Sequence, residues 1–167
     1  MKKEEVVLEL LIGLTVFGAL LAGGALFAFS SFVMPALRSV DAHSAITSMQ
    51  AMNVEAPRSA LMLPLVGSAV TAIAAAVWAS ISRPEGWVLA LVGCVGVLAA
   101  FAVTVIYHVP HNDAFASVGT ADEASWTAYA AGWTMWNHVR VGLYLASGIV
   151  LAVSAVPPAI RTVDAAQ

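Results

Sequence analysis

The sequence is poor in charge. Only 10% of its 167 residues are Asp, Glu, Lys or Arg, and the formal net charge is −3. No cluster of basic residues follows Lys2 and Lys3. The chain therefore lacks the basic surface that neutralises the phosphates of nucleic acids, and we expect no nucleic-acid partner.

Cysteine is nearly absent, since Cys94 is the only one. One thiol cannot form a disulfide framework or a thiolate metal cluster within a chain, so we expect Cys94 to be a small core residue. The sequence also lacks the GxxxxGK[ST], GxGxxG and HExxH motifs. Nucleotide hydrolysis, dinucleotide binding and zinc-protease chemistry therefore have no support, and no organic cofactor is indicated.

Apolar residues dominate instead. They make up 60% of the chain, and the mean hydropathy is +0.88. Four long stretches carry no charge, and each is long enough as a helix to cross a hydrocarbon layer, which takes roughly 20 residues. We predict an all-α membrane protein, a four-transmembrane-helix bundle that forms one domain over residues 1–167. The predicted spans cover about 6–33, 59–81, 87–107 and 139–156.

The first apolar run could also be a secretory signal, because Lys2 and Lys3 precede it. Glu4, Glu5 and Glu9 weaken the positive segment with which a signal begins. The run is also longer than the roughly 7–15 apolar residues of a signal. A retained span is the better prediction.

Prolines and capping residues set the predicted helix ends. Pro35 is expected to end the first span, because proline cannot donate the hydrogen bond that continues a helix. Asp41 can cap an additional amphipathic helix at about 42–55, which we expect to lie on the membrane. The short connection 82–86 makes the second and third spans an antiparallel hairpin.

The last helix is predicted from its capping signal. Pro110 is expected to break regular structure after the third span, since it disfavours helical geometry at Val109. Thr120 and Glu123 then match a capping box, in which each side chain bonds the other residue's backbone N–H. The sequence therefore predicts one long helix from about 121 to 156.

The membrane orientation follows from loop charges. Four spans place both termini on one side, and the segments 34–58 and 108–140 on the other. The terminal side carries Lys2, Lys3, Arg83 and Arg161, and the other side carries Arg38, Arg58 and Arg140. This small excess favours cytoplasmic termini. The high Ala, Gly and Val content suggests a bacterial cytoplasmic membrane, and Gly-rich helices surrounded by membrane lipid permit a homo-oligomer.

An aromatic stripe marks the start of the last helix. Trp126, Tyr129, Trp133, Trp136 and Arg140 follow one another at spacings of three and four residues, so they share one helical face. Such a stripe fits an interfacial belt of aromatic rings with an arginine that reaches lipid phosphates. It equally fits an aromatic wall for a flat ligand. The residues alone leave both interpretations open.

All four histidines fall on the side of the membrane that holds this stripe. His43, His108, His111 and His138 could together supply the three or four imidazoles of a metal site. One of them could instead be a general base, because histidine titrates near neutral pH. A third possibility is a structural role, since histidines near helix ends often bond free carbonyls.

Several motifs together resemble the anthrone oxygenase family. They are Phe29–Leu37, Met49-Gln50-Ala51-Met52-Asn53, Val109–Asp113 and Trp133–Arg140, of which Trp136-Asn137-His138-Val139-Arg140 is the most specific. The resemblance implies an integral membrane oxygenase that converts an anthrone, a three-ring aromatic ketone, to a quinone with O2. In the family pattern, other residues often occupy the places of His108 and His111, so a metal role for them would be particular to this chain.

The chemistry of this reaction, the matching motifs and the aromatic stripe together lead to a hypothesis for the roles of individual residues. His138 or His108 would be the base, and Asn112, Asn137 and Arg140 would stabilise the oxyanion. Residues that would bind the substrate are Trp133, Trp136, Trp126, Tyr129, Gln50 and Asn53. The alternative is a noncatalytic membrane protein that binds a small hydrophobic ligand or serves as a subunit of a membrane complex.

Overall fold

The computed structural model describes residues 3–156, and this part of the chain contains helices and no strands. Four long helices account for most of it: α1 (Lys3–Ala28), α4 (Met62–Ser82), α5 (Trp87–Val103) and α7 (Glu123–Ser154). Short helices occupy the connections. These are the π-helix η1 (Phe29–Val33), α2 (Met34–Arg38), α3 (Ala42–Glu55), the 3-10 helix η2 (Ala56–Arg58), the π-helix η3 (Thr104–His108) and α6 (Val109–Phe115).

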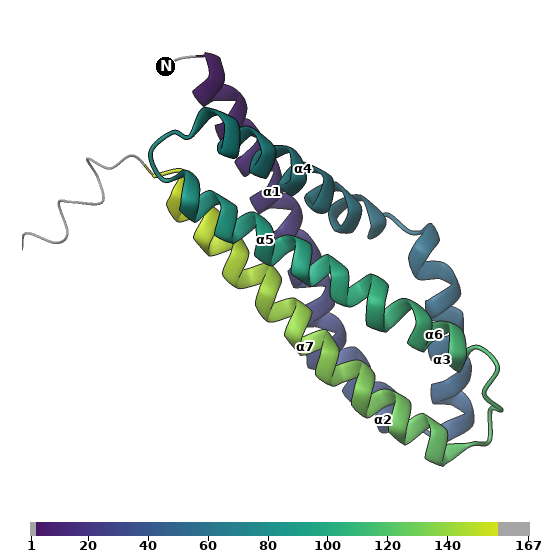
Figure 1. The fold of residues 1–167 in the computed structure, drawn as a ribbon. Coiled ribbons are helices and arrows are strands. Elements are labelled where there is room, and N and C mark those ends of the chain that lie inside the picture. Colours follow the sequence, from purple (N-terminus) through teal and green to yellow (C-terminus); the bar gives the residue numbers. More distant parts are fainter. Residues whose placement is uncertain (1–2, 157–167) are drawn as a thin grey trace, which may run out of the picture.

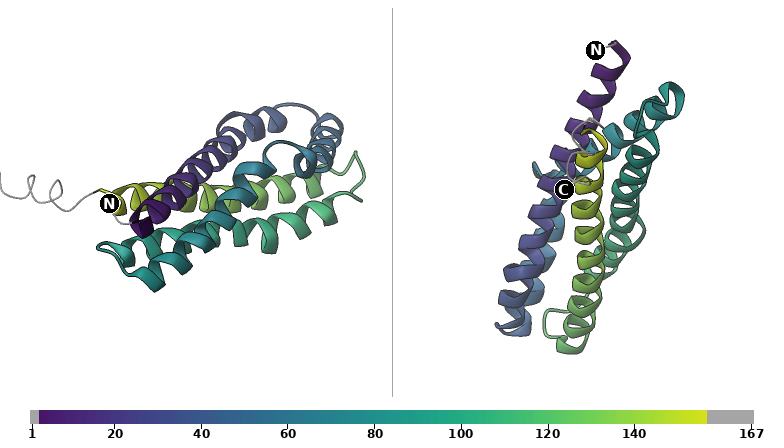
Figure 2. Two further views of the ribbon diagram at one scale, coloured as in Figure 1. Left: turned by 90° about the horizontal axis from the view of Figure 1, so that it is seen from above. Right: turned by 90° about the vertical axis from the view of Figure 1, so that its left-hand side faces the viewer.

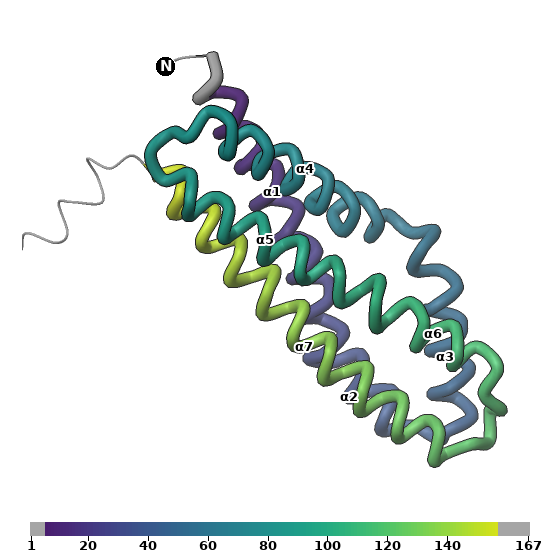
Figure 3. The backbone as a smooth tube through the Cα atoms, in the orientation of Figure 1, coloured from purple at the N-terminus to yellow at the C-terminus, as the bar shows by residue number. Residues whose placement is uncertain are grey.

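The four long helices lie side by side (Figures 1 and 2). α1 packs against α4 and α7, and α5 packs against the same two helices. The start of α1, the end of α7 and the α4–α5 connection gather at one end of the molecule, as the trace in Figure 3 shows. The helices α2, α3 and α6 lie at the other end, which agrees with the predicted grouping of the two longer connections.

Three helical segments are long and apolar enough to cross a membrane: Val6–Arg38, Met62–Ser82 and Trp87–Phe115. Their outward faces carry large apolar side chains, such as Phe17, Leu63 and Ile106, which are 68%, 76% and 76% exposed. Such a surface is costly in water and favourable in lipid. These three segments agree with three of the predicted spans. Their length and apolar composition are those expected of an integral membrane protein.

The α4–α5 hairpin forms as predicted. α4 ends at Ser82, and the chain turns through residues 83–86 before α5 begins at Trp87. Arg83 (φ 44°) and Gly86 (φ 82°) adopt left-handed conformations that reverse the chain. Glycine reaches this region without steric cost, whereas Arg83 is a non-glycine residue there. The Arg83 guanidinium lies 5.4 Å from the ring centroid of Trp87, a cation–π contact at the hairpin end.

Both prolines that were expected to interrupt helices lie inside continuous ones. Pro35 and Pro110 each occupy the second position of a short α-helix that follows a π-helix directly. The N–H groups of Met34 and Val109 bond carbonyls five residues back, not four. The wider π turn relieves the clash between a proline ring and the carbonyl four residues earlier. The predicted helix end at Pro35 and the predicted break at Pro110 are therefore wrong.

The helix α3 has the predicted bounds, and Asp41 caps it by accepting the Ser44 N–H at 2.9 Å. Its buried side chains Ala45, Ile46 and Met49 belong to a cluster with aromatic residues of α6 and α7. The apolar face of α3 thus packs against protein. The prediction that this helix lies on the membrane through that face is corrected accordingly.

The cap of α7 differs from the prediction. Asp122, and not Thr120, is the N-cap residue, since its carboxylate accepts the Ser125 N–H at 2.9 Å and the Ser125 hydroxyl at 2.6 Å. These bonds hold the pKa of the Asp122 carboxyl below its usual value. Asp122 thus takes the N-cap position that was predicted for Thr120, and the predicted capping box between Thr120 and Glu123 does not form.

Small residues allow the long helices to approach closely. The inner faces of α4 and α5 are lined by Ala72, Ala75, Ala79, Ala90 and Ala100, all buried. Cys94 is buried among them, as the sequence predicts. Close backbone approach of this kind is typical of packing between membrane helices.

Gly93 provides a test of this packing. A Cβ atom at Gly93 would lie 2.5 Å from Leu151 Cγ, across the α5–α7 contact. We expect Gly93→Ala to lower the free energy of unfolding by about 1–3 kcal/mol, because the overpacked helices must separate. A Cβ atom at Gly142 would meet nothing within 4 Å, so Gly142→Ala is the matched control and should not destabilise. Unfolding of both variants in detergent measures the difference, and equal stability would contradict the close contact.

Candidate functional site

A cavity of about 180 Å³ lies where α1, α3, α4 and α7 surround the junction of α5 and α6. Both π-helices contribute to its wall, through Phe29 of η1 and through Thr104 and His108 of η3. Interruptions of this type occur often at functional sites. Most of the wall is apolar, and it includes Leu26, Phe29, Met49, Met52, Leu61, Met62, Leu65 and Val109.

The cavity is larger than one aromatic ring requires. An enclosed apolar cavity of roughly 150 Å³ holds benzene. Three of the wall residues are methionines, whose flexible side chains can repack around a larger ligand. Pro57 and Val109 also line the cavity and are exposed on the outside of the protein.

Arg140 lines the cavity and places a positive charge there, without a carboxylate nearby in the described part of the chain. It is only 4% exposed, and its Nε donates to Asn137 Oδ1 at 2.7 Å and its Nη1 to Thr104 Oγ1 at 3.3 Å. Its guanidinium also lies 5.4 Å from the ring centroid of Trp133. Among the described residues no carboxylate pairs with it, since the ion pair recorded there joins Arg58 and Glu55. Buried charges are normally paired, so this arginine is poised to bind an anionic or strongly polar group.

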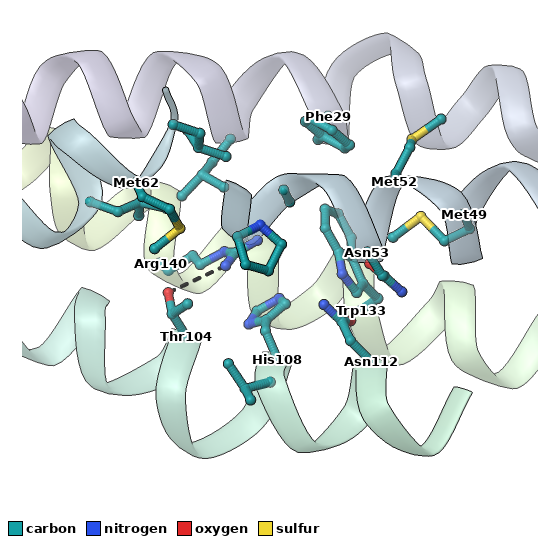
Figure 4. Close-up of a pocket in the computed structure, with 16 residues that line it drawn as sticks. Phe29, Met49, Met52, Asn53, Met62, Thr104, His108, Asn112, Trp133 and Arg140 are labelled. Atoms are coloured by element: carbon teal, nitrogen blue, oxygen red, sulfur yellow. Dashed lines mark hydrogen bonds between the residues drawn. The ribbon is translucent and has the colours of Figure 1, made fainter. Parts of the chain in front are cut away.

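His108 is buried in the same wall, 1% exposed (Figure 4). Its Nδ1 lies 3.4 Å from the carbonyl oxygen of Val103. A carbonyl can only accept, so this contact favours the proton on Nδ1 and leaves the lone pair on Nε2. Nε2 has no hydrogen-bond partner within the described chain. The contact with the Val103 carbonyl favours the tautomer that a general base requires.

Trp133 completes the aromatic part of the wall. Its ring meets His108 edge-on at a centroid distance of 5.4 Å and lies 5.9 Å from Phe29. Its Nε1 is buried and, like His108 Nε2, lacks a partner among the described residues. A buried donor without an acceptor is rare in native proteins and calls for a ligand or a water. Within the described chain, the residues of the cavity wall thus include a donor and an acceptor without partners and a cation without a carboxylate.

Asn53 and Asn112 form a second polar group, on the side of the cavity away from Arg140 and Thr104 (Figure 4). They are joined through Tyr129, whose hydroxyl donates to Asn112 Oδ1 at 2.8 Å and accepts from Asn53 Nδ2 at 3.1 Å. Burial raises the pKa of the Tyr129 hydroxyl, so it remains a donor at all ordinary pH values. This separation places Asn112 with Asn53 and not beside Arg140, where the oxyanion role would need it.

Asn137 acts behind the cavity wall. It is fully buried, and its Nδ2 donates to the Leu26 carbonyl oxygen at 2.8 Å and to the Ser30 hydroxyl. Its Oδ1 accepts from Arg140. It therefore orients the guanidinium and ties α7 to α1, but it does not line the cavity itself.

The remaining predicted site residues lie outside the cavity. His138 is exposed, so its position does not support a role as base. Gln50 donates to the carbonyls of Phe115 and Val118 and thereby fixes the end of α6. Trp126 is buried beside Phe115, and the ring of Trp136 lies tilted against Tyr107 at a centroid distance of 5.2 Å.

The four histidines do not come together as a metal site. Among the described residues, no three His, Cys, Asp or Glu side chains lie close enough to hold a metal ion. His43 and His138 are exposed, whereas His108 is buried in the cavity wall. His111 stacks on Tyr129 at a centroid distance of 4.8 Å, and it meets the tilted ring of Tyr107 at 4.9 Å. The predicted site of three or four imidazoles is therefore not assembled.

Comparison with known proteins identifies the family. The family model described as anthrone oxygenase matches residues 54–150, more than half of the chain. The chain belongs to the anthrone oxygenase family. Within the match lie Thr104, His108, Asn112, Trp133 and Arg140, the polar and aromatic residues of the cavity that α5–α7 supply. Neither a curated protein nor a solved structure matches the chain.

The match to the anthrone oxygenase family model covers a smaller part of the chain than the sequence motifs do. It begins at residue 54, so the motifs at Phe29–Leu37 and Met49–Asn53 lie before it. Those segments nevertheless supply Phe29, Met49, Met52 and Asn53 to the cavity. The structure thus joins the family segment and the preceding segment in one site.

The apolar wall residues were not among the predicted site residues, and one polar wall residue, Thr104, was missed because of the predicted break at Pro110. Thr104, His108 and Asn112 are spaced by four residues along η3 and α6, and all three line the cavity. A continuous helix would have placed them on one face. The signal was present in the sequence, but it depends on the helix running through the proline.

Proposed function

We propose that this protein is a membrane-embedded oxygenase that oxidises an anthrone-like three-ring substrate with O2 to a quinone. The observation that carries the proposal is that one apolar cavity holds an imidazole with a free Nε2 and a buried arginine without a carboxylate partner. Deprotonation of a ketone-activated carbon needs this pair of groups, a base for the proton and a cation for the resulting oxyanion.

The proposed reaction begins with proton transfer. His108 Nε2 takes a proton from the CH2 carbon opposite the carbonyl in the central ring, and the electron pair moves through the ring to the carbonyl oxygen. Arg140 stabilises the oxyanion that forms there. The buried indole N–H of Trp133 offers a further donor within the same wall.

The oxidation step needs no further reductant. The electron-rich enolate adds O2 at the deprotonated carbon, a C–O bond forms, and the resulting peroxide takes up a proton. Loss of the second C–H proton then breaks the O–O bond and releases water. The balance is anthrone plus O2 to quinone plus water, so the organic substrate supplies all the electrons. The protein supplies proton transfer, charge stabilisation and a dry aromatic pocket.

The second half of α7 is proposed as a fourth span, which completes a four-helix transmembrane bundle. This half packs between α1 and α5, both of which belong to candidate spans. Its outward side chains Val139, Leu145, Ile149 and Val153 are apolar and exposed. The polar residues of α7 gather in its first half, which explains why the helix as a whole is less apolar. The termini then share one side, which we assign to the bacterial cytoplasm.

Oxygen incorporation tests the proposed function. Purified protein in lipid nanodiscs is supplied with anthrone and ¹⁸O2, and the product is analysed by mass spectrometry. We expect a protein-dependent rate, one O2 consumed per quinone formed, and one ¹⁸O atom in each quinone. Release of hydrogen peroxide in place of label incorporation would contradict an oxygenase. A protein that binds anthrone without any turnover would support the noncatalytic alternative.

A further inference from the structure

The hydrogen bonds between Asn53, Tyr129 and Asn112 leave a fixed pattern of unused groups at the cavity. The Tyr129 hydroxyl has a single hydrogen, which it donates to Asn112 Oδ1, so it must accept from Asn53 Nδ2. The two amides therefore face this hydroxyl with opposite groups, one oxygen and one nitrogen. Asn112 keeps its Nδ2 donors, and Asn53 keeps its Oδ1 acceptor. Neither has another partner recorded within residues 3–156.

This pair of groups matches one functional group better than others. A hydroxyl can accept from Asn112 Nδ2 and donate to Asn53 Oδ1 at the same time. An ether or a carbonyl can only accept, and a C–H can do neither. Both asparagines line the cavity, so a ligand there can reach them.

The position of this pair fits an outer ring of a three-ring ligand. Thr104, which bonds Arg140, and Asn112 are eight residues apart along η3 and α6, which corresponds to about 12 Å at the helical rise. In the proposed binding mode the oxyanion lies on the central ring and faces Arg140. A substituent on one outer ring can then extend toward the two asparagines.

We propose that Asn53 and Asn112, held in register by Tyr129, select a substrate with a hydroxyl on an outer ring. The inference rests on the proposed binding of a three-ring substrate in the cavity. Asn53 and Asn112 are the specificity-determining residues. Tyr129 does not line the cavity, so it is a positioning residue that acts through them.

Binding of stable quinones tests this selection without depending on turnover. The probes are anthraquinone, 2-hydroxyanthraquinone and 2-methoxyanthraquinone, titrated into the full-length protein in nanodiscs. We expect the hydroxyl compound to bind about tenfold more tightly than anthraquinone, which can form neither hydrogen bond, and several-fold more tightly than the methoxy compound, which can only accept one. The methoxy compound separates a need for the hydroxyl hydrogen from a general preference for a polar substituent.

The variant Tyr129→Phe removes only the hydroxyl and keeps the ring that stacks on Phe115 at 3.7 Å. Without it the two amides are free to bond each other, and we expect the preference for the hydroxyl to fall to about twofold or less. Binding of anthraquinone itself should stay within about twofold. Tyr107→Phe is the matched control, because Tyr107 belongs to the same aromatic stack but does not bond either asparagine. It should keep the wild-type preference.

The outcomes separate this inference from the proposed function. If wild-type protein binds the three quinones equally, or if Tyr129→Phe keeps the full preference, the selection by Asn53 and Asn112 is overturned while turnover of anthrone still stands. If no quinone binds at all, both the selection and the proposed function are overturned.

Discussion

The variant His108→Gln is expected to oxidise anthrone about 10²–10⁴-fold more slowly than the wild-type protein, the range by which a general base accelerates proton transfer. Glutamine is similar in length and remains polar at the Val103 carbonyl, but it cannot take up a proton near neutral pH. The loss should appear in kcat, because substrate contacts with Trp133 and the apolar wall are kept. Single-turnover kinetics with excess protein measure the chemical step directly.

His111→Gln is the matched control for this prediction. His111 lies one helical turn away, but its ring is enclosed between Tyr107 and Tyr129 and does not line the cavity. We expect its turnover to stay within a few-fold of wild type. A deuterium label on the CH2 carbon adds a further readout, since proton transfer should become more rate-limiting in His108→Gln. Equal rates for the two histidine variants would exclude His108 as the base.

Replacement of Arg140 by methionine is expected to lower kcat/KM by about 10²–10³-fold, as does removal of one oxyanion donor in other enzymes. Methionine retains much of the buried aliphatic volume. The variant loses the bonds to Asn137 and Thr104, but it also removes a buried charge that has no carboxylate partner. Because desolvation of that charge opposes folding, we expect stability to change much less than activity.

Arg38→Met provides the comparison. Arg38 also bonds α7, through the Ala130 carbonyl oxygen at 2.8 Å and the Thr134 hydroxyl at 3.1 Å, but it does not line the cavity. Loss of this arginine should leave turnover near wild type. If Arg140→Met retains full activity, or if both variants lose activity in parallel with stability, the guanidinium of Arg140 does not stabilise the oxyanion.

The sequence predicts much of the architecture because membrane spans follow from simple length and hydropathy. The inner face of α7 also follows from helical periodicity, since Trp126, Tyr129 and Trp133 are all buried. The same periodicity does not decide whether Trp136 or Asn137 faces the inside of the bundle, because the two residues are adjacent in the sequence. Packing against α1 decides this choice, because the Leu26 carbonyl and the Ser30 hydroxyl bond Asn137.

The errors arise where local rules compete with longer-range structure. Proline normally interrupts a helix, but a preceding π turn accommodates both Pro35 and Pro110. The grouping of Asn53 with Tyr129 joins α3 to α7 across 76 residues. No periodicity within either helix encodes that contact, so it becomes visible only when the helices are packed.

The position of a bound quinone shows whether chemistry and recognition take place in one cavity. We predict that a structure of the protein with 2-hydroxyanthraquinone shows the rings beside Trp133, one ring carbonyl within hydrogen-bond distance of the Arg140 guanidinium, and His108 Nε2 facing the opposite carbon of the central ring. A quinone on the lipid-facing surface, with the cavity empty or filled by a lipid chain, would contradict a catalytic role for this cavity.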